Sequence, residues 1–228
     1  MGNTFIGRLG THIERRGDTF FKSGEGEAAK DLAAERERLV WLAGKLPVPR
    51  VLAFDESSML ISAIAGAPAH ESRCPAQRIV EILADALRMI HAVPIDGCPF
   101  RDTLEHELRE AERRMREGNI KRNAFTAGLT PEETLDELRR TRELVRADVF
   151  THGDYCLPNV IVDNDALSGF VDWGQAGLAD PHRDLLGARN SILRNLGEEW
   201  VDPFFARYGI DPDPERLRYY ALLDQFWQ

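Results

Sequence analysis

Hydrophobic and polar positions follow two different periods in the N-terminal part of the chain. Short apolar runs separated by turn residues predict strands, whereas apolar residues between Glu27 and Gly44 recur at helical spacing and predict a helix that ends before Pro47. The turn Arg16-Gly17-Asp18 between two apolar runs is typical of a hairpin. The predicted strands lie at residues 12–14, 19–22, 50–54 and 59–64.

The pattern changes after Gly66-Ala67-Pro68, which we interpret as a linker. Beyond it the periodicity is mainly helical, apart from two strands at residues 160–162 and 168–172 that the turn Asp163-Asn164-Asp165 joins. Strands around one helix, followed by a mainly helical region, predict an α+β fold. The predicted helices of this second region lie at residues 76–92, 103–118, 131–146, 182–196 and 214–226.

Charge and cysteine content limit the classes of partner and of structural site that the protein can have. The 228 residues carry 38 acidic and 29 basic side chains, a net charge of −9, and the sequence has no basic tract, so we expect no nucleic-acid partner. Cys74, Cys98 and Cys156 are too widely separated for a zinc motif or a disulfide framework. No apolar run approaches the roughly 20 residues of a membrane span. We therefore expect no membrane partner and a cytoplasmic location.

Glu35 interrupts the apolar face of the first predicted helix, which otherwise carries Ala28, Leu32, Leu39 and Leu42. A carboxylate on a core-facing stripe is costly unless it is paired. Lys22, at the end of an apolar strand in the same region, is the candidate partner. The alternative is that Glu35 lies at the helix edge and Lys22 is solvated, and the pattern alone leaves both open.

A second group of polar residues surrounds the hairpin at 160–172. Asp154 and Asn159 lie in the loop that leads into its first strand, and Asp172 ends its second strand. Because an antiparallel return brings these strand ends together, we expect the three side chains to converge. Carboxylate and amide oxygens suit Mg²⁺ with its phosphate ligands, and a further carboxylate is able to orient a hydroxyl. The full spacing, from His152-Gly153-Asp154 to Asp172-Trp173-Gly174, is far more specific than an isolated Asp-Gly turn.

Together these segments resemble the aminoglycoside phosphotransferases, most closely the aminoglycoside 3′-phosphotransferases, which are small-molecule relatives of the protein kinases. The resemblance covers nearly the whole chain and is carried by residues of both regions. The matching stretches are Phe21-Lys22, 37–42, Cys98-Pro99-Phe100, 151–154, 168–172, 177–180, Tyr208-Gly209-Ile210 and Leu222-Leu223-Asp224.

The resemblance implies a bilobal, protein-kinase-like fold. Residues 1–65 would form a nucleotide-binding lobe that is short relative to the family, and residues 66–228 a helical lobe with the catalytic loop, metal site and acceptor site. The implied activity is transfer of the γ-phosphate of ATP, or of GTP, to a hydroxyl of a small molecule. An aminoglycoside antibiotic is the implied acceptor, and we expect a monomer or a homodimer.

The resemblance also implies roles for individual residues. Asp154 would orient the acceptor hydroxyl and accept its proton, and Asn159 and Asp172 would hold Mg²⁺ on the triphosphate. Lys22, held by Glu35, would contact the α- and β-phosphates. His152 would be structural, without a proton-transfer role. Backbone groups of the hinge between the lobes would bind the nucleotide base, and the matching residues are Ser62, Ala63 and Ile64.

The residues expected to contact the acceptor depart from the family pattern. Asp154 and Asp224 keep carboxylates there, but Gln175 replaces an arginine, and the region of Arg189 and Asn190 is followed by Arg194 and Asn195 instead of two carboxylates. The segment 119–124 likewise lacks the family's acidic run. Carboxylates would attract the ammonium groups of an aminoglycoside. A kinase of another hydroxyl compound (another antibiotic, an amino alcohol or a sugar) and a non-catalytic nucleotide-binding protein therefore remain alternatives.

Overall fold

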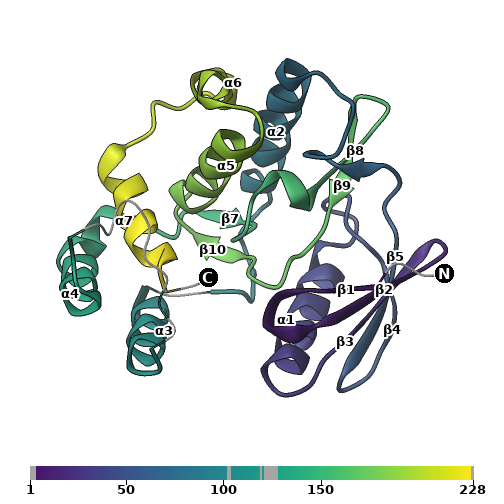
Figure 1. The fold of residues 1–228 in the computed structure, drawn as a ribbon, viewed down its shortest axis with the longest axis horizontal. Coiled ribbons are helices and arrows are strands. Elements are labelled where there is room, and N and C mark those ends of the chain that lie inside the picture. Colours follow the sequence, from purple (N-terminus) through teal and green to yellow (C-terminus); the bar gives the residue numbers. More distant parts are fainter. Residues whose placement is uncertain (1–3, 102–103, 119, 121–127, 227–228) are drawn as a thin grey trace.

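Figure 1 shows a sheet with one helix beside it, joined to a larger and mainly helical part. The structure is a computed structural model that describes residues 4–101, 104–118, 120 and 128–226. Helices and antiparallel sheets together confirm the predicted α+β class.

An antiparallel sheet of five strands, in the order β1-β2-β3-β5-β4, forms the N-terminal lobe. Helix α1 packs against β3, β4 and β5. A short 3₁₀ turn at Arg8–Gly10 follows the first strand. The elements of this lobe are β1 (Thr4–Ile6), β2 (His12–Arg16), β3 (Thr19–Ser23), α1 (Glu27–Leu42), β4 (Val51–Phe54) and β5 (Ser58–Ser62).

Local sequence explains these elements. Arg16 of β2 pairs with Thr19 of β3 across a two-residue turn, in which Gly17 has a left-handed φ of 62°. Helix α1 buries the predicted stripe of Ala28, Leu32, Leu39 and Leu42, together with Glu35. The helix ends at Leu42, two residues before the predicted end, and Gly44 then takes a left-handed φ of 78°.

The larger lobe carries the predicted helices, and α6 in addition. Helix α6 was not predicted because it has only eight residues and Pro203 lies in its first turn, where proline is tolerated. Among the described residues, no helix has the length and apolar character needed to cross a bilayer. The helices are α2 (Ala76–His91), α3 (Leu104–Arg116), α4 (Pro131–Thr141), α5 (His182–Asn195), α6 (Val201–Tyr208) and α7 (Pro214–Asp224).

The larger lobe also contains two small sheets. One has the order β6-β8-β9 and the other pairs β7 with β10. The linker predicted at 66–68 is wrong, because Ala67 and Pro68 form β6 and pair with Val162 and Ile161. Strands β1, β7 and β10 were not predicted, since three residues carry too little periodicity. The bounds are β6 (Ala67–Pro68), β7 (Val149–Thr151), β8 (Val160–Asp163), β9 (Ala166–Phe170) and β10 (Gly177–Ala179).

The two lobes share one apolar core. Leu32 and Leu39 of α1 belong to the same cluster as Phe150 and Trp173 of the larger lobe. Polar contacts add to this junction, since Nε of Arg38 on α1 donates to the carbonyl of Ala176 at 2.6 Å. The position of α1, and of any side chain that it carries toward the cleft, is therefore fixed relative to the larger lobe.

Candidate active site

Two cavities lie beside the loop formed by residues 152–159. The first, of about 380 Å³, lies between the five-stranded sheet and β8, and we call it the interlobe cleft. The second, of about 580 Å³, lies among α3, α5 and α7, and we call it the helical pocket. Asn159 lines the interlobe cleft and Asp154 lines the helical pocket. The loop 152–159 therefore presents one polar side chain to each cavity.

Lys22 and Glu35 form a buried ion pair in the wall of the interlobe cleft. Nζ of Lys22 lies 2.7 Å from both carboxylate oxygens of Glu35, and the two side chains are 12% and 5% exposed. Burial by itself lowers the pKa of Lys22, but the carboxylates of Glu35 and Asp172 outweigh burial and hold that pKa above its usual value. Lys22 is therefore a cation at neutral pH. The contact expected from the interrupted apolar stripe is present.

Asn159 and Asp154 are joined directly. The Nδ2 atom of Asn159 donates to the backbone carbonyl of Asp154 at 2.9 Å and to its carboxylate at 3.2 Å. Because Nδ2 makes both of these bonds, the Oδ1 atom of Asn159 is left to accept from a donor, or to bind a cation, in the interlobe cleft. The link also restricts where the Asp154 carboxylate points.

Asp172 lies where the predicted antiparallel return places it. The backbone N–H of Val171 donates to the carbonyl of Asn159 at 3.0 Å, so Asp172 follows directly after a residue bonded to Asn159. Strand β9 ends at Phe170, two residues earlier than predicted, and Asp172 has a left-handed φ of 64°. That conformation is uncommon outside glycine and is found disproportionately at functional sites. The carboxylate lines the interlobe cleft together with Lys22.

His152 is fully buried and holds the loop against the strand end. Its Nε2 donates to the carbonyl of Val171 at 3.0 Å, and its Nδ1 accepts from the N–H of Asp154 at 3.3 Å. The ring also packs on Trp173, with centroids 4.4 Å apart. Both nitrogens are used in backbone contacts, which supports a structural role.

Helix α5 holds the loop 152–159 at several points, and the sequence reasoning did not identify these residues. The carboxylate of Asp184 accepts from the N–H groups of His152 and Gly153 at 2.7 and 2.8 Å. About two turns further along α5, Oγ of Ser191 accepts from the N–H of Leu157 at 3.0 Å. At Gly187 a Cβ would lie 2.7 Å from the carbonyl of Tyr155, so only glycine allows this close approach.

Asp184 is an ionised carboxylate inside the protein. It is completely buried, and burial alone raises the pKa of a carboxyl group, but hydrogen bonds from the ring of His91 and from the backbone N–H of His152 hold the Asp184 pKa below its usual value. The sequence held one sign of this role: Asp184 lies at helical spacing from Ala188 and Ser191, which are buried on the same helix.

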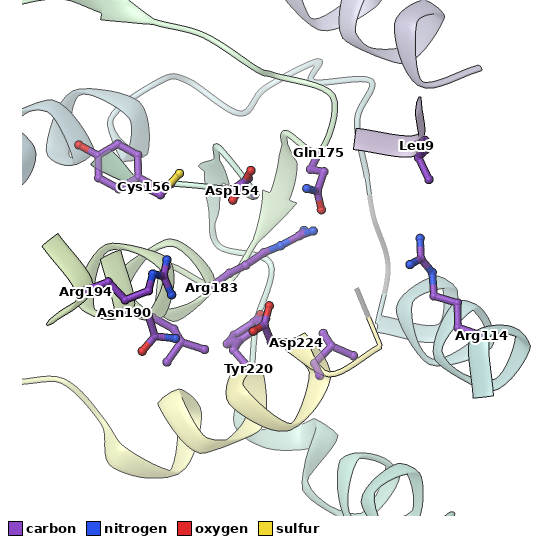
Figure 2. A pocket seen from close by; sticks show the side chains of 15 residues that line it. Leu9, Arg114, Asp154, Cys156, Gln175, Arg183, Asn190, Arg194, Tyr220 and Asp224 are labelled. Atoms are coloured by element: carbon purple, nitrogen blue, oxygen red, sulfur yellow. The ribbon is translucent and has the colours of Figure 1, made fainter. Parts of the chain in front are cut away.

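The helical pocket mixes acidic and basic side chains. Figure 2 shows Asp154 and Gln175 on one side, Arg194 and Asn190 along α5, and Asp224 on α7. Arg183 also lines the pocket and forms an ion pair with Glu107 of α3, with Nη1 and Oε1 3.3 Å apart.

Of the predicted acceptor residues, Asp154, Asn190 and Asp224 line the helical pocket, whereas Arg189 does not. Nη1 of Arg189 instead donates to Oδ1 of Asn190 at 3.3 Å. The segment at 119–124, with Lys121 and Arg122, falls outside the described residues apart from Ile120.

Cys156 also lines the helical pocket, but it is not suited to nucleophilic catalysis. Burial, with the nearby Asp154 and Asp172 carboxylates, raises the pKa of its thiol to about 12. A thiol with that pKa stays protonated at neutral pH, and the thiolate is the nucleophile. Cys156 is therefore excluded as a nucleophile of this pocket at neutral pH.

Only one of the three predicted base-binding residues lines the interlobe cleft. Ile64 lines the interlobe cleft, whereas Ser62 and Ala63 do not. The backbone N–H groups of Ser62 and Ala63 donate to the carbonyls of Arg50 and Asp18 at 2.9 and 2.8 Å. These two donors are used within the N-terminal lobe, so Ile64 is the member of this group that faces the cleft.

The oxygen atoms of Asn159 and Asp172 fit a magnesium ion. They are hard donors on the same wall of the interlobe cleft, and they provide fewer ligands than an octahedral ion needs, which leaves room for water and phosphate oxygens. Within the part of the chain that the structure describes, no group of three or more His, Cys, Asp or Glu side chains is arranged to hold a metal ion. An ion at this wall would therefore share its coordination with a bound ligand.

A buried Lys–Glu pair, a loop carrying Asp154 and Asn159, and Asp172 beside it are the parts of a kinase-like phosphotransferase. The family model described as the phosphotransferase enzyme family matches residues 11–220. The chain belongs to this family, and the resemblance stated from the sequence is confirmed.

Individual relatives agree with this assignment. The chain is 36% identical to an aminoglycoside 3′-phosphotransferase of Niallia circulans over 97% of its length and 90% of the relative's. It is 37% identical to a streptomycin 3″-kinase of Streptomyces griseus, over 96% and 89% of the two chains.

Solved structures give the same fold. The aminoglycoside phosphotransferase APH(3″)-Id of Streptomyces rimosus superposes with a TM-score of 0.85 at 30% identity, covering 99% of this chain and 92% of the other. A second structure of that enzyme, in complex with ADP and streptomycin, superposes with a TM-score of 0.83 at 28% identity. The protein-kinase-like fold is thereby confirmed.

Proposed function

We propose that this phosphotransferase moves the γ-phosphate of ATP to a hydroxyl group of an aminoglycoside. The observation that carries the proposal is the hydrogen bond between Asn159 and Asp154, which joins the interlobe cleft to the helical pocket. A triphosphate in the cleft and a hydroxyl in the pocket would then meet at the loop 152–159. Residues 1–65 would form the nucleotide-binding lobe, and residues 66–228 the lobe that carries the acceptor site.

The side chains of the interlobe cleft are suited to a triphosphate. The cation of Lys22 would bind the α- and β-phosphates, and Glu35 keeps it in place. Asn159 and Asp172 would hold Mg²⁺, which supplies neutralisation of the charge that develops on the transferred phosphate. Ile64 would pack against the nucleotide base.

Asp154 would act on the acceptor. Its carboxylate lines the helical pocket and not the interlobe cleft, so it is placed to accept a hydrogen bond from a hydroxyl in the pocket. Because Nδ2 of Asn159 restricts the carboxylate, the hydroxyl would be directed toward the phosphate before reaction. Asp154 would take the proton as the new O–P bond forms.

The direct test is phosphate transfer by the purified protein. ATP and Mg²⁺ are supplied with streptomycin, a kanamycin-type aminoglycoside, an amino alcohol or a sugar, and ADP release is measured together with the mass of the product. We expect a phosphorylated aminoglycoside. Phosphorylation of the amino alcohol or sugar alone, or no transfer to any acceptor, would contradict the proposal.

A kinase of another hydroxyl compound is the second candidate. Three arginines, Arg114, Arg183 and Arg194, line the helical pocket beside two carboxylates, Asp154 and Asp224. This balance is less favourable to a polycation than a pocket rich in carboxylates. The same acceptor panel separates the two candidates.

The metal assignment predicts an order of effects on nucleotide binding. Asp172→Ala removes an anionic ligand and is expected to abolish the gain in ATP affinity that Mg²⁺ provides. Asn159→Ala removes a neutral oxygen and is expected to reduce that gain less. Calorimetry of ATP binding with and without Mg²⁺ measures both. Equal gains in wild type and the two variants would place the metal elsewhere.

The acceptor assignment predicts a gain from Arg194→Glu. Arg194 is exposed at the helical pocket, and reversing its charge is expected to improve kcat/KM for a multi-amine aminoglycoside about threefold to tenfold, less at high salt. Arg218→Glu is the control, because Arg218 is exposed on α7 and lies outside the pocket lining. An equal effect of both substitutions would indicate the overall charge of the protein, not the pocket.

A further inference from the structure

His91 lies at the end of α2 and contacts neither cavity, yet it is bonded to the carboxylate that holds the loop 152–159. Its Nε2 lies 3.2 Å from Oδ2 of Asp184, and the two side chains are 6% and 0% exposed. The same Oδ2 accepts from the N–H of His152 at 2.7 Å. Two hydrogen bonds, both to the Asp184 carboxylate, therefore link His91 to the backbone that precedes Asp154.

Tyr208 of α6 contacts the other ring nitrogen of His91. Its hydroxyl lies 2.7 Å from Nδ1 of His91. Burial, with the nearby Asp184 carboxylate, raises the pKa of Tyr208 to about 12, so the hydroxyl keeps its proton and is able to donate it to Nδ1. The ionised carboxylate of Asp184 only accepts hydrogen bonds, so Nε2 of His91 carries a proton and donates it to Oδ2.

The backbone at this point is sensitive to small movements. Gly153, whose N–H donates to Oδ1 of Asp184, has a left-handed φ of 83°, and a Cβ there would lie 2.2 Å from the carbonyl of Gln175. A rotation of the Asp184 carboxylate would release both N–H donors of the loop. Asp154 directly follows Gly153, so the direction of the Asp154 side chain depends on how the Asp184 carboxylate is held.

We propose that His91 and Tyr208 are positioning residues for phosphate transfer, acting through Asp184 on the backbone that aims the Asp154 carboxylate. The proposal rests on the function assigned above to Asp154. Neither residue lines the interlobe cleft or the helical pocket, so substitutions of both are expected to affect turnover more than binding.

The structure supplies a matched control for this network. Arg207 and Asp85 form an ion pair, with Nη2 and Oδ2 2.6 Å apart, between α6 and α2, the two helices that Tyr208 and His91 also join. Both side chains are about half exposed, and neither is bonded to Asp184. Asp85→Asn therefore weakens the contact between α2 and α6 without changing the network.

The test compares four variants with wild type: His91→Leu, His91→Gln, Tyr208→Phe and Asp85→Asn. His91→Leu removes the donor to Asp184 and is expected to lower kcat about tenfold or more, with the Kd for ATP and the acceptor KM within about twofold. His91→Gln keeps an N–H that reaches Asp184 and is expected to recover most of the loss. Tyr208→Phe should give a smaller decrease, and Asp85→Asn none.

A readout independent of turnover accompanies the kinetics. Hydrogen exchange of the peptide that contains residues 152–156 is expected to be faster in His91→Leu and Tyr208→Phe than in wild type or Asp85→Asn. If wild type transfers no phosphate, the function assigned to Asp154 fails, whatever the exchange data give. If wild type is active, the inference fails when His91→Leu keeps wild-type kcat, or when Asp85→Asn loses as much as Tyr208→Phe. Should His91→Leu not fold, the comparison of Tyr208→Phe with Asp85→Asn decides.

Discussion

Asp154→Asn is expected to lower the rate of phosphate transfer by about 10²-fold to 10⁴-fold, the usual cost of losing a positioned base. The substitution keeps the shape of the side chain, and the amide oxygen is still able to accept from Nδ2 of Asn159, which lies 3.2 Å from the carboxylate. What is lost is the negative charge that attracts and accepts the proton of the acceptor hydroxyl. Single-turnover measurement of phosphate transfer at saturating acceptor isolates this step.

Nucleotide affinity is expected to stay within a few-fold in Asp154→Asn, because Asp154 lines the helical pocket and not the interlobe cleft. Asp224→Asn is the matched control, since it removes a carboxylate from another wall of the same pocket. It is expected to raise the acceptor KM while leaving kcat close to wild type. An Asp154→Asn protein with undiminished turnover would show that another group accepts the proton.

Much of the candidate site could be predicted because its parts are close in the sequence or interrupt a regular pattern. Asp154, Asn159 and Asp172 flank one hairpin, so antiparallel pairing alone brings them together, and the structure bonds Val171 to Asn159. Glu35 was visible as a carboxylate on an apolar stripe. Such signals need neither long-range contacts nor knowledge of the whole fold.

The parts that could not be predicted depend on contacts between distant elements. Strand β10 exists because Gly177–Ala179 pairs with β7 across the loop, and three residues give no periodicity of their own. Asp184 becomes important only where α5 passes the loop 152–159, thirty residues or so from it in sequence. Likewise, the sequence does not reveal that the N–H groups of Ser62 and Ala63 are used within the N-terminal lobe.

Replacing Lys22 by Met is expected to destabilise the protein by about 3–5 kcal/mol, because it leaves the Glu35 carboxylate buried without its partner. Glu35→Leu should have a similar effect, since it leaves the ammonium group of Lys22 buried without its partner. Lys30→Met is the control: Lys30 and Glu27 also lie 2.7 Å apart on α1, but their side chains are 76% and 68% exposed, and little change is expected. Chemical denaturation of each variant measures the free energy of unfolding.

The double variant Lys22→Met/Glu35→Leu separates stability from function. Replacing both members of a buried ion pair by apolar residues of similar size is often neutral or stabilising, so the free energy of unfolding should return close to that of wild type. The KM for ATP should stay raised, because the cation for the phosphates is still absent. Recovery of both properties would mean that Lys22 serves only the fold. Wild-type stability of both single variants would mean that the pair is open to solvent, against the 12% and 5% exposure of its two side chains.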